Sequence, residues 1–144
     1  MKQTYRVLAG LIALGVLVQA AAIAFGWFSA LSDIDSGAVI DGDYEGNAGH
    51  AIHGMNGMMV IPLLALVFLV VSFFAKIPGG VTWAALVFLA VVVQVALGLF
   101  AHALVGLGIL HGANALVLFG LAVMAGKRVD TAVRTVTSPE AATV

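Results

Sequence analysis

The sequence predicts an all-α integral membrane protein: a four-transmembrane-helix up-down bundle with both termini in the cytoplasm. Of its 144 residues, 62% are hydrophobic and only 9% are charged, whereas about 25% of residues are charged in soluble domains. Long uncharged stretches separate the charges, and four crossings would place every basic residue on one side. Six Lys and Arg against seven Asp and Glu leave no basic excess, and there is no cysteine. Nucleic-acid binding, disulfides and thiol chemistry are therefore excluded.

The uncharged stretches define the predicted spans. They run over residues 7–32, 46–75 and 77–126. Because a spanning helix needs about 20 apolar residues, the first two stretches hold one helix each and the third holds two. The predicted helices cover about 6–30, 50–75, 81–102 and 108–126. They form one bundle over residues 1–128, and residues 129–144 form a polar cytoplasmic tail.

The basic residues set the predicted orientation. With four spans, all of them fall on one side of the membrane: Lys2, Arg6, Lys76, Lys127, Arg128 and Arg134. The positive-inside rule places this side in the cytoplasm. The loop over about 31–49, which carries Asp33, Asp35, Asp41, Asp43 and Glu45, then lies on the outer side. We therefore expect a multi-pass protein of the cytoplasmic (inner) membrane, in contact with the lipid bilayer.

All four histidines fall near the outer ends of the predicted helices. His50 and His53 open the second helix, His102 closes the third, and His111 lies about one turn into the fourth. An ionisable side chain within a span is costly unless it finds a partner in the bundle interior. The spans contain no Asp, Glu, Lys or Arg, so the histidines must be satisfied by one another, by a carbonyl, by water, by a metal or by a cofactor.

His53 and His111 lie at matched depth on helices that are diagonal in an up-down bundle. Two imidazoles facing each other across a bundle core are the axial ligand set of a six-coordinate haem iron. Small residues such as Gly57, one turn from His53, would make room for the flat ring. The sequence therefore predicts His53 and His111 as the axial ligands of haem b.

Other polar residues near this layer are further candidates for cofactor contact. Gln94 shares a stripe of the third helix with His102, and Asn114 lies three residues after His111. Asn114 could bond a carbonyl or a haem propionate. For Gln94 and Asn114 the alternative is an interhelical hydrogen bond. For His50 and His102 the alternative is an interfacial residue bonded to water or headgroups.

Three short segments carry a resemblance to a known family. They are His50-Ala-Ile-His53-Gly54, Gln94-Val-Ala-Leu97-Gly98 and Leu110-His111-Gly-Ala-Asn-Ala115. Their order and spacing resemble one four-helix half of haem A synthase, the membrane enzyme that converts haem O to haem A. In that family, histidines from the second and fourth helices of a half ligate haem. The resemblance implies the same role for His53 and His111.

The sequence departs from the family in several respects. The family has two fused halves, whereas this chain has one. Its substrate half has Glu three residues before the second-helix histidine, where this chain has His50, and commonly Arg directly after that histidine, where this chain has Gly54. The family's loop cysteines are also missing. The chain thus resembles a haem-holding relative without the oxidising machinery, and no nucleophile–base pair or buried carboxylate points to an enzyme.

Three functional hypotheses follow. The first is a small bis-histidine, b-type cytochrome-like protein for electron transfer or haem holding, acting alone, as a homodimer or within a larger respiratory complex. The second is a non-catalytic accessory or assembly subunit of a respiratory membrane complex, with structural histidines. The third is a copper or zinc site on the outer side, built from His50, His53, His102 and His111.

Overall fold

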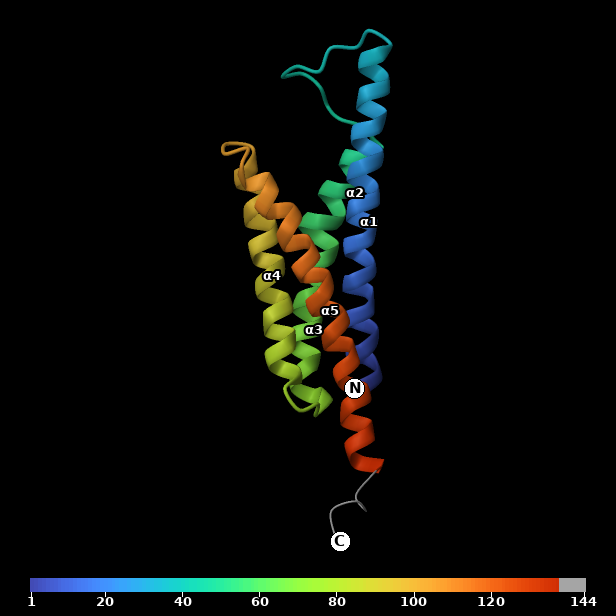
Figure 1. The fold of residues 1–144 in the computed structure, drawn as a ribbon, viewed down its shortest axis with the longest axis vertical. Helices are drawn as coiled ribbons and strands as arrows, with labels where there is room; N and C mark the ends of the chain where they lie inside the picture. Colours follow the sequence, from blue (N-terminus) through green and yellow to red (C-terminus); the bar gives the residue numbers. More distant parts are fainter. Residues whose placement is uncertain (138–144) are drawn as a thin grey trace.

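Four helical rods make up the bundle in the computed structural model, which describes the backbone of residues 1–137 and the side chains of residues 1–130 (Figure 1). The elements are α1 (Lys2–Asp35), α2 (Ala48–Met55), the π-turn η1 (Asn56–Val60), α3 (Ile61–Ala75), α4 (Gly80–Ala101) and α5 (Leu107–Thr137). Since α2, η1 and α3 follow one another without a break, they form a single rod. The predicted all-α architecture of four helices is confirmed.

Two helices are longer than predicted. α1 continues to Asp35, five residues past its expected end near 30, and α5 continues to Thr137 instead of ending near 126. The first part of the expected polar tail is therefore helical, and residues 138–144 lie outside the described residues. The helix continues past the apolar stretch because Lys, Arg and Ala are good helix formers and no Pro or Gly occurs over residues 127–137.

All four rods are long and apolar enough to cross a bilayer. Each also points large apolar side chains outward, for example Leu17, Phe73, Leu89 and Leu116, which are between 53% and 75% exposed. In water such continuous apolar surface would drive association, whereas in lipid it is the expected outer surface of a bundle. The protein is therefore a multi-pass membrane protein.

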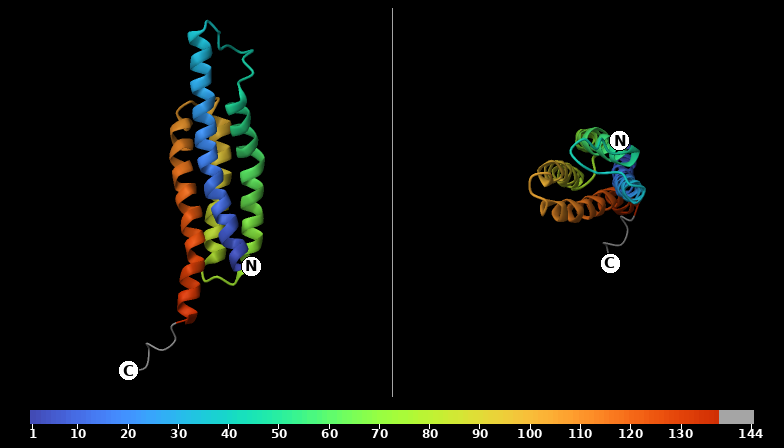
Figure 2. Two further views of the ribbon diagram at one scale, coloured as in Figure 1. Left: turned by 90° about the vertical axis from the view of Figure 1, so that its right-hand side faces the viewer. Right: turned by 90° about the horizontal axis from the view of Figure 1, so that it is seen from above.

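The two ends of the bundle differ in chemistry. The N-terminus, the α3–α4 turn and the end of α5 lie together at one end (Figure 2). We call this the basic end, because Lys2, Arg6, Lys76, Lys127 and Arg128 belong to these segments. An ion pair between Arg6 and Asp130 joins α1 to α5 there. The α1–α2 and α4–α5 loops lie at the opposite end, which we call the histidine end.

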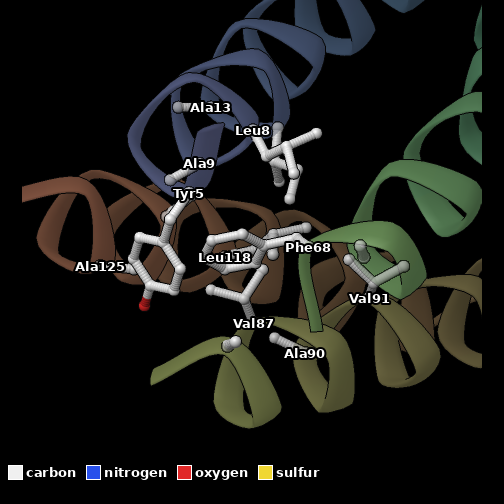
Figure 3. Close-up of a cluster of buried hydrophobic side chains, with 14 of the residues drawn as sticks. Tyr5, Leu8, Ala9, Ala13, Phe68, Val87, Ala90, Val91, Leu118 and Ala125 are labelled. Atoms are coloured by element: carbon white, nitrogen blue, oxygen red, sulfur yellow. The ribbon is translucent and has the colours of Figure 1, made fainter. Parts of the chain in front are cut away.

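The apolar core is built from residues of the half of the bundle next to the basic end. Figure 3 shows part of this cluster. Its largest fully buried side chains are Tyr5, Ile12, Phe68, Val87 and Leu118, which together come from all four rods. The rings of Tyr5 and Phe68 pack with their centroids 4.5 Å apart. The Tyr5 hydroxyl donates a hydrogen bond of 2.9 Å to the carbonyl of the α4 residue Gly80. This half therefore needs no further partner to be well packed.

The half next to the histidine end is packed differently. No residue of 50–60, 92–101 or 107–117 is buried, although the same rods bury their inner faces in the other half. The pair α4/α5 leans away from the pair α1/α2 towards this end (Figure 1). The residues of α2, α4 and α5 in this half are thus partly or fully exposed, in contrast to those of the other half.

The π-turn η1 interrupts the second rod between these two halves. It begins at Asn56, three residues after His53, and ends just before Pro62. Proline has no backbone N–H and disturbs the regular hydrogen bonds of the preceding turn. Single π-turns inside helices are frequent at functional sites, and this one lies directly beside a candidate site residue.

Candidate functional site

The structure brings His53 and His111 together across the histidine half of the bundle. His53 projects from α2 and His111 from α5, and their ring centroids lie 6.2 Å apart with the planes inclined at 56°. Both side chains are partly buried. These two rods are diagonal, because α1 and α4 pack between them on either side.

Each of the two imidazoles is anchored by a backbone carbonyl of the neighbouring helix. Nδ1 of His53 lies 3.1 Å from the carbonyl oxygen of Gln19, and Nδ1 of His111 lies 3.1 Å from that of Gln94. A carbonyl oxygen can only accept a hydrogen bond, so each Nδ1 must carry the hydrogen. In the neutral ring Nε2 then holds a free lone pair, which is the form that ligates a metal.

The spacing of the two rings fits a single metal atom between them. A metal–nitrogen bond of about 2.0–2.1 Å, together with roughly 1.1 Å from a ring nitrogen to the ring centre, gives about 6.2–6.4 Å between the centroids of two opposed ligands. The observed separation is 6.2 Å.

The anchoring contacts are repeated in the two halves of the chain. Asn56, three residues after His53, donates from Nδ2 to the carbonyl of Gly15 at 3.4 Å. Asn114, three residues after His111, donates from Nδ2 to the carbonyl of Ala90 at 2.9 Å. In each half the accepting residue lies four positions before the glutamine whose carbonyl anchors the histidine. The helix pairs α1/α2 and α4/α5 therefore use the same hydrogen-bond pattern.

The sequence carries the same repeat. Gly15-Val-Leu-Val-Gln19 in α1 corresponds to Ala90-Val-Val-Val-Gln94 in α4, and His53-Gly-Met-Asn56 corresponds to His111-Gly-Ala-Asn114. Gln19, which the sequence analysis did not single out, is the counterpart of the predicted site residue Gln94. The paired Val-x-Val-Gln and His-Gly-x-Asn segments were the signal that would have identified it.

Gln94 and Asn114 make interhelical hydrogen bonds. The side-chain oxygen Oε1 of Gln94 accepts a bond of 2.7 Å from Nδ2 of Asn114, which also bonds the carbonyl of Ala90. Both residues thus join α4 to α5. This is the interhelical hydrogen bonding that the sequence analysis gave as the alternative to cofactor contact. They lie beside His111 and join it to the adjacent helix.

The glycines of the site have a different role from the one expected. Gly57 was predicted to leave room for a cofactor, but a Cβ there would lie 2.3 Å from Nε2 of Gln19. A Cβ at Gly98 would lie 3.1 Å from Cε1 of His111. These two glycines therefore make room for neighbouring protein side chains. At Gly54 and Gly112, beside the two histidines, no heavy atom lies within 4 Å of an added Cβ.

His50 is part of a helix cap instead of the His53–His111 pair. The side chain of Asn47 accepts from the backbone N–H groups of Gly49 and His50, and Nδ1 of His50 accepts from the N–H of Asn47 at 3.3 Å. Its ring meets Trp27 edge-on, with centroids 5.1 Å apart. This reciprocal capping box starts α2 and uses the Nδ1 lone pair of His50.

His102 is exposed at the C-terminal cap of α4 and takes no part in the contacts described for the other three histidines. Over the described part of the chain, no group of three or more His, Cys, Asp or Glu side chains is arranged to hold a metal ion. The expectation of a copper or zinc cluster of four histidines is therefore wrong. The reason is that His50 turns to its own helix terminus and His102 to the surface.

The site thus consists of two anchored imidazoles and the repeated glutamine–asparagine contacts behind them. Its residues come from all four rods and lie between the apolar core and the histidine end. Comparison of the chain with protein-family models, with curated protein sequences and with solved structures found no match.

Proposed function

We propose that the protein is a small membrane haem-binding protein, in which His53 and His111 are the two axial ligands of haem b. The observation that carries this proposal is the pair of anchored rings. Both hold their Nδ1 hydrogen on a carbonyl, which frees Nε2, and their centres are 6.2 Å apart. A bis-histidine haem supplies one-electron transfer, so the proposed role is electron transfer or haem holding.

The packing of the histidine half supports a large apolar ligand. The inner faces of α4 beyond Val91 and of α5 before Leu118 contain no buried residue, whereas both helices are well buried in the other half. A flat apolar ring between the helix pairs would cover these faces. The glycines Gly54 and Gly112, next to the two histidines, offer no side chain that would oppose it.

The protein's own groups would also adjust the properties of the iron. A hydrogen bond from Nδ1 to a carbonyl makes the imidazole a stronger electron donor. Such a bond on both sides favours the oxidised form of a bound iron and lowers its potential. The proposed site therefore suits a cytochrome of low potential more than one of high potential.

We further propose that the basic end faces the cytoplasm and the histidine end faces outward in the cytoplasmic membrane. The positive-inside rule supports this orientation, since the acidic residues of the α1–α2 loop (Asp41, Asp43 and Glu45) lie at the other end from the basic ones. The resemblance of the histidine and glutamine segments to one half of haem A synthase agrees with a haem site near the outer leaflet. A homodimer or a larger respiratory complex is the proposed setting.

The visible spectrum of the purified protein tests this function. After addition of haem, the reduced-minus-oxidised spectrum should show sharp Soret and α bands. His53→Ala and His111→Ala should each abolish them. His102→Ala is the matched control, because it removes an exposed imidazole from the same end of the bundle. Bands that survive in both ligand variants, or a wild type that takes up no haem, would refute the proposal.

A second candidate is a non-catalytic accessory subunit of a respiratory membrane complex. The observation in its favour is that His53 and His111 each already have a hydrogen-bond partner on a neighbouring helix. Such bonds could serve helix association alone. A colourless protein that co-purifies with a larger complex, and whose His53→Ala and His111→Ala variants lose only stability, would favour this candidate.

A further inference from the structure

We propose that Asn114 and Asn56 are positioning residues that hold the two imidazoles through the neighbouring helices, and that Asn114 holds its side more firmly. The two axial ligands are then unequal, although the helix pairs are repeats of each other. The consequence for a bound iron rests on the proposed haem function. The consequence for the imidazoles themselves does not, since it concerns hydrogen bonds within the protein.

On the α5 side, one amide group closes a ring of contacts. Nδ2 of Asn114 lies 2.9 Å from the carbonyl oxygen of Ala90 and 2.7 Å from Oε1 of Gln94. The carbonyl of the same Gln94 anchors Nδ1 of His111 at 3.1 Å. Because Asn114 and His111 are three residues apart, they share one face of α5. Asn114 thereby fixes residues 90–94 of α4. The carbonyl of Gln94 in this segment accepts the hydrogen bond from the His111 ring.

On the α2 side, the corresponding contacts are weaker. Nδ2 of Asn56 reaches the carbonyl of Gly15 at 3.4 Å, near the upper limit for a hydrogen bond. Oε1 of Gln19 is buried and has no hydrogen-bond partner among the described residues, whereas its counterpart in Gln94 is bonded. The amide–amide bond of the α5 side is therefore missing here.

The π-turn follows directly on the weaker side. η1 begins at Asn56, whose carbonyl accepts from the N–H of Ile61, whereas Asn114 lies within the uninterrupted helix α5. Asn56 itself keeps regular helical dihedral angles (φ −64°, ψ −42°). The difference between the two sides therefore lies in the longer contact of Asn56 with α1 and in the unbonded Oε1 of Gln19.

The ring tautomers provide a test that does not require haem. In full-length protein labelled with ¹⁵N-histidine and free of haem, His53 and His111 should both show the Nδ1–H form. Asn114→Ala should shift the His111 signals towards a mixture with the Nε2–H form, while Asn56→Ala should change the His53 signals less. Asn114→Leu keeps a side chain of similar size but has no hydrogen-bond donor, so it should shift the His111 signals as Asn114→Ala does.

The haem-loaded protein provides a second readout. Loss of the Nδ1–H bond makes an imidazole a weaker donor, so Asn114→Ala should raise the midpoint potential more than Asn56→Ala. Ser72→Ala is the control for loss of a polar side chain in general: its Oγ is buried in the basic half and bonds the carbonyl of Leu69 at 2.6 Å. It should change neither the tautomers nor the potential.

The outcomes separate the two proposals. If Asn114→Ala, or Asn114→Leu where the alanine variant does not fold, leaves the His111 signals like those of Ser72→Ala, the positioning role is refuted. An effect of Asn56→Ala equal to or larger than that of Asn114→Ala refutes the inequality. If the tautomers respond as expected but the wild type takes up no haem, the positioning role stands and the haem function falls.

Discussion

Gly49 is the position where α1 and α2 approach most closely, and its replacement by alanine should separate the two helices. A Cβ at Gly49 would lie 2.4 Å from the backbone nitrogen of Gly26, 2.5 Å from its Cα and 2.6 Å from the carbonyl oxygen of Ala22. All three are backbone atoms, which no side-chain rotation can move away. Helices in a membrane associate through close packing of such small residues, because lipid offers no hydrophobic drive between them.

The size of the effect follows from these distances. Ordinary contact begins at 3.4 Å, so the helices must part by about 1 Å from the present 2.4 Å. Overpacking of this kind costs about 1–3 kcal/mol. Alanine regains at most about 1 kcal/mol through its higher helix propensity, and less here because Gly49 lies in the first turn of α2. When the gain in helix propensity is subtracted from the cost of overpacking, Gly49→Ala should lower the free energy of unfolding by about 1–2 kcal/mol.

The same displacement should reach the site. His53 lies one turn after Gly49, and its Nδ1 is 3.1 Å from the carbonyl of Gln19 in α1. A separation of about 1 Å would lengthen this contact to about 4 Å, well beyond the length of an N–H···O bond. The variant should therefore also release the His53 ring, which ¹⁵N-histidine spectra would show as a mixed tautomer.

Unfolding in mixed micelles with increasing SDS, followed by circular dichroism, measures the stability. Gly54→Ala is the matched control: it lies in the same helix, and no atom lies within 4 Å of its added Cβ. It should be neutral or slightly stabilising. If Gly49→Ala proves as stable as Gly54→Ala, and its His53 keeps the Nδ1–H form, the close approach of α1 and α2 is not the constraint argued here.

Substitutions at two further positions test other contacts by the same unfolding measurement. Tyr5→Phe keeps the packed ring but leaves the buried Gly80 carbonyl without its 2.9 Å partner, so it should cost about 1–3 kcal/mol; an unchanged midpoint would show that the hydroxyl contributes nothing. His50→Gln should keep the capping box with Asn47, because glutamine is an accepted partner at this position, whereas His50→Ala should cost about 0.5–2 kcal/mol. Equal losses in both variants would contradict the capping role of His50.

Much of the site followed from local pattern. The shared depth of His53 and His111 could be read from their distance to the helix ends, and up-down connectivity made their helices diagonal. Gln94 and Asn114 stood out because polar side chains are rare in an apolar span. Gln19 was equally polar, but it escaped attention without the comparison of the two Val-x-Val-Gln segments.

Other features depended on contacts that form only in the folded chain. The role of His50 in the α2 cap depends on the backbone of Asn47 and the ring of Trp27, neither of which marks His50 as structural in the sequence. Similarly, Gly57 makes room for Gln19, a residue of another helix. A glycine in a sequence shows that space is needed but not which neighbour needs it.

The amino-acid sequence by itself determined the number of spans, the separation of basic and histidine ends, and the facing pair of histidines. These depend on the length of apolar stretches and on the alternation of direction, which are local quantities. The tertiary structure alone decided which carbonyls hold the rings, and that Asn114 contacts α4 at shorter distances than Asn56 contacts α1. Hydrogen bonds between helices depend on distances of a few tenths of an ångström, and only the packed backbone sets these.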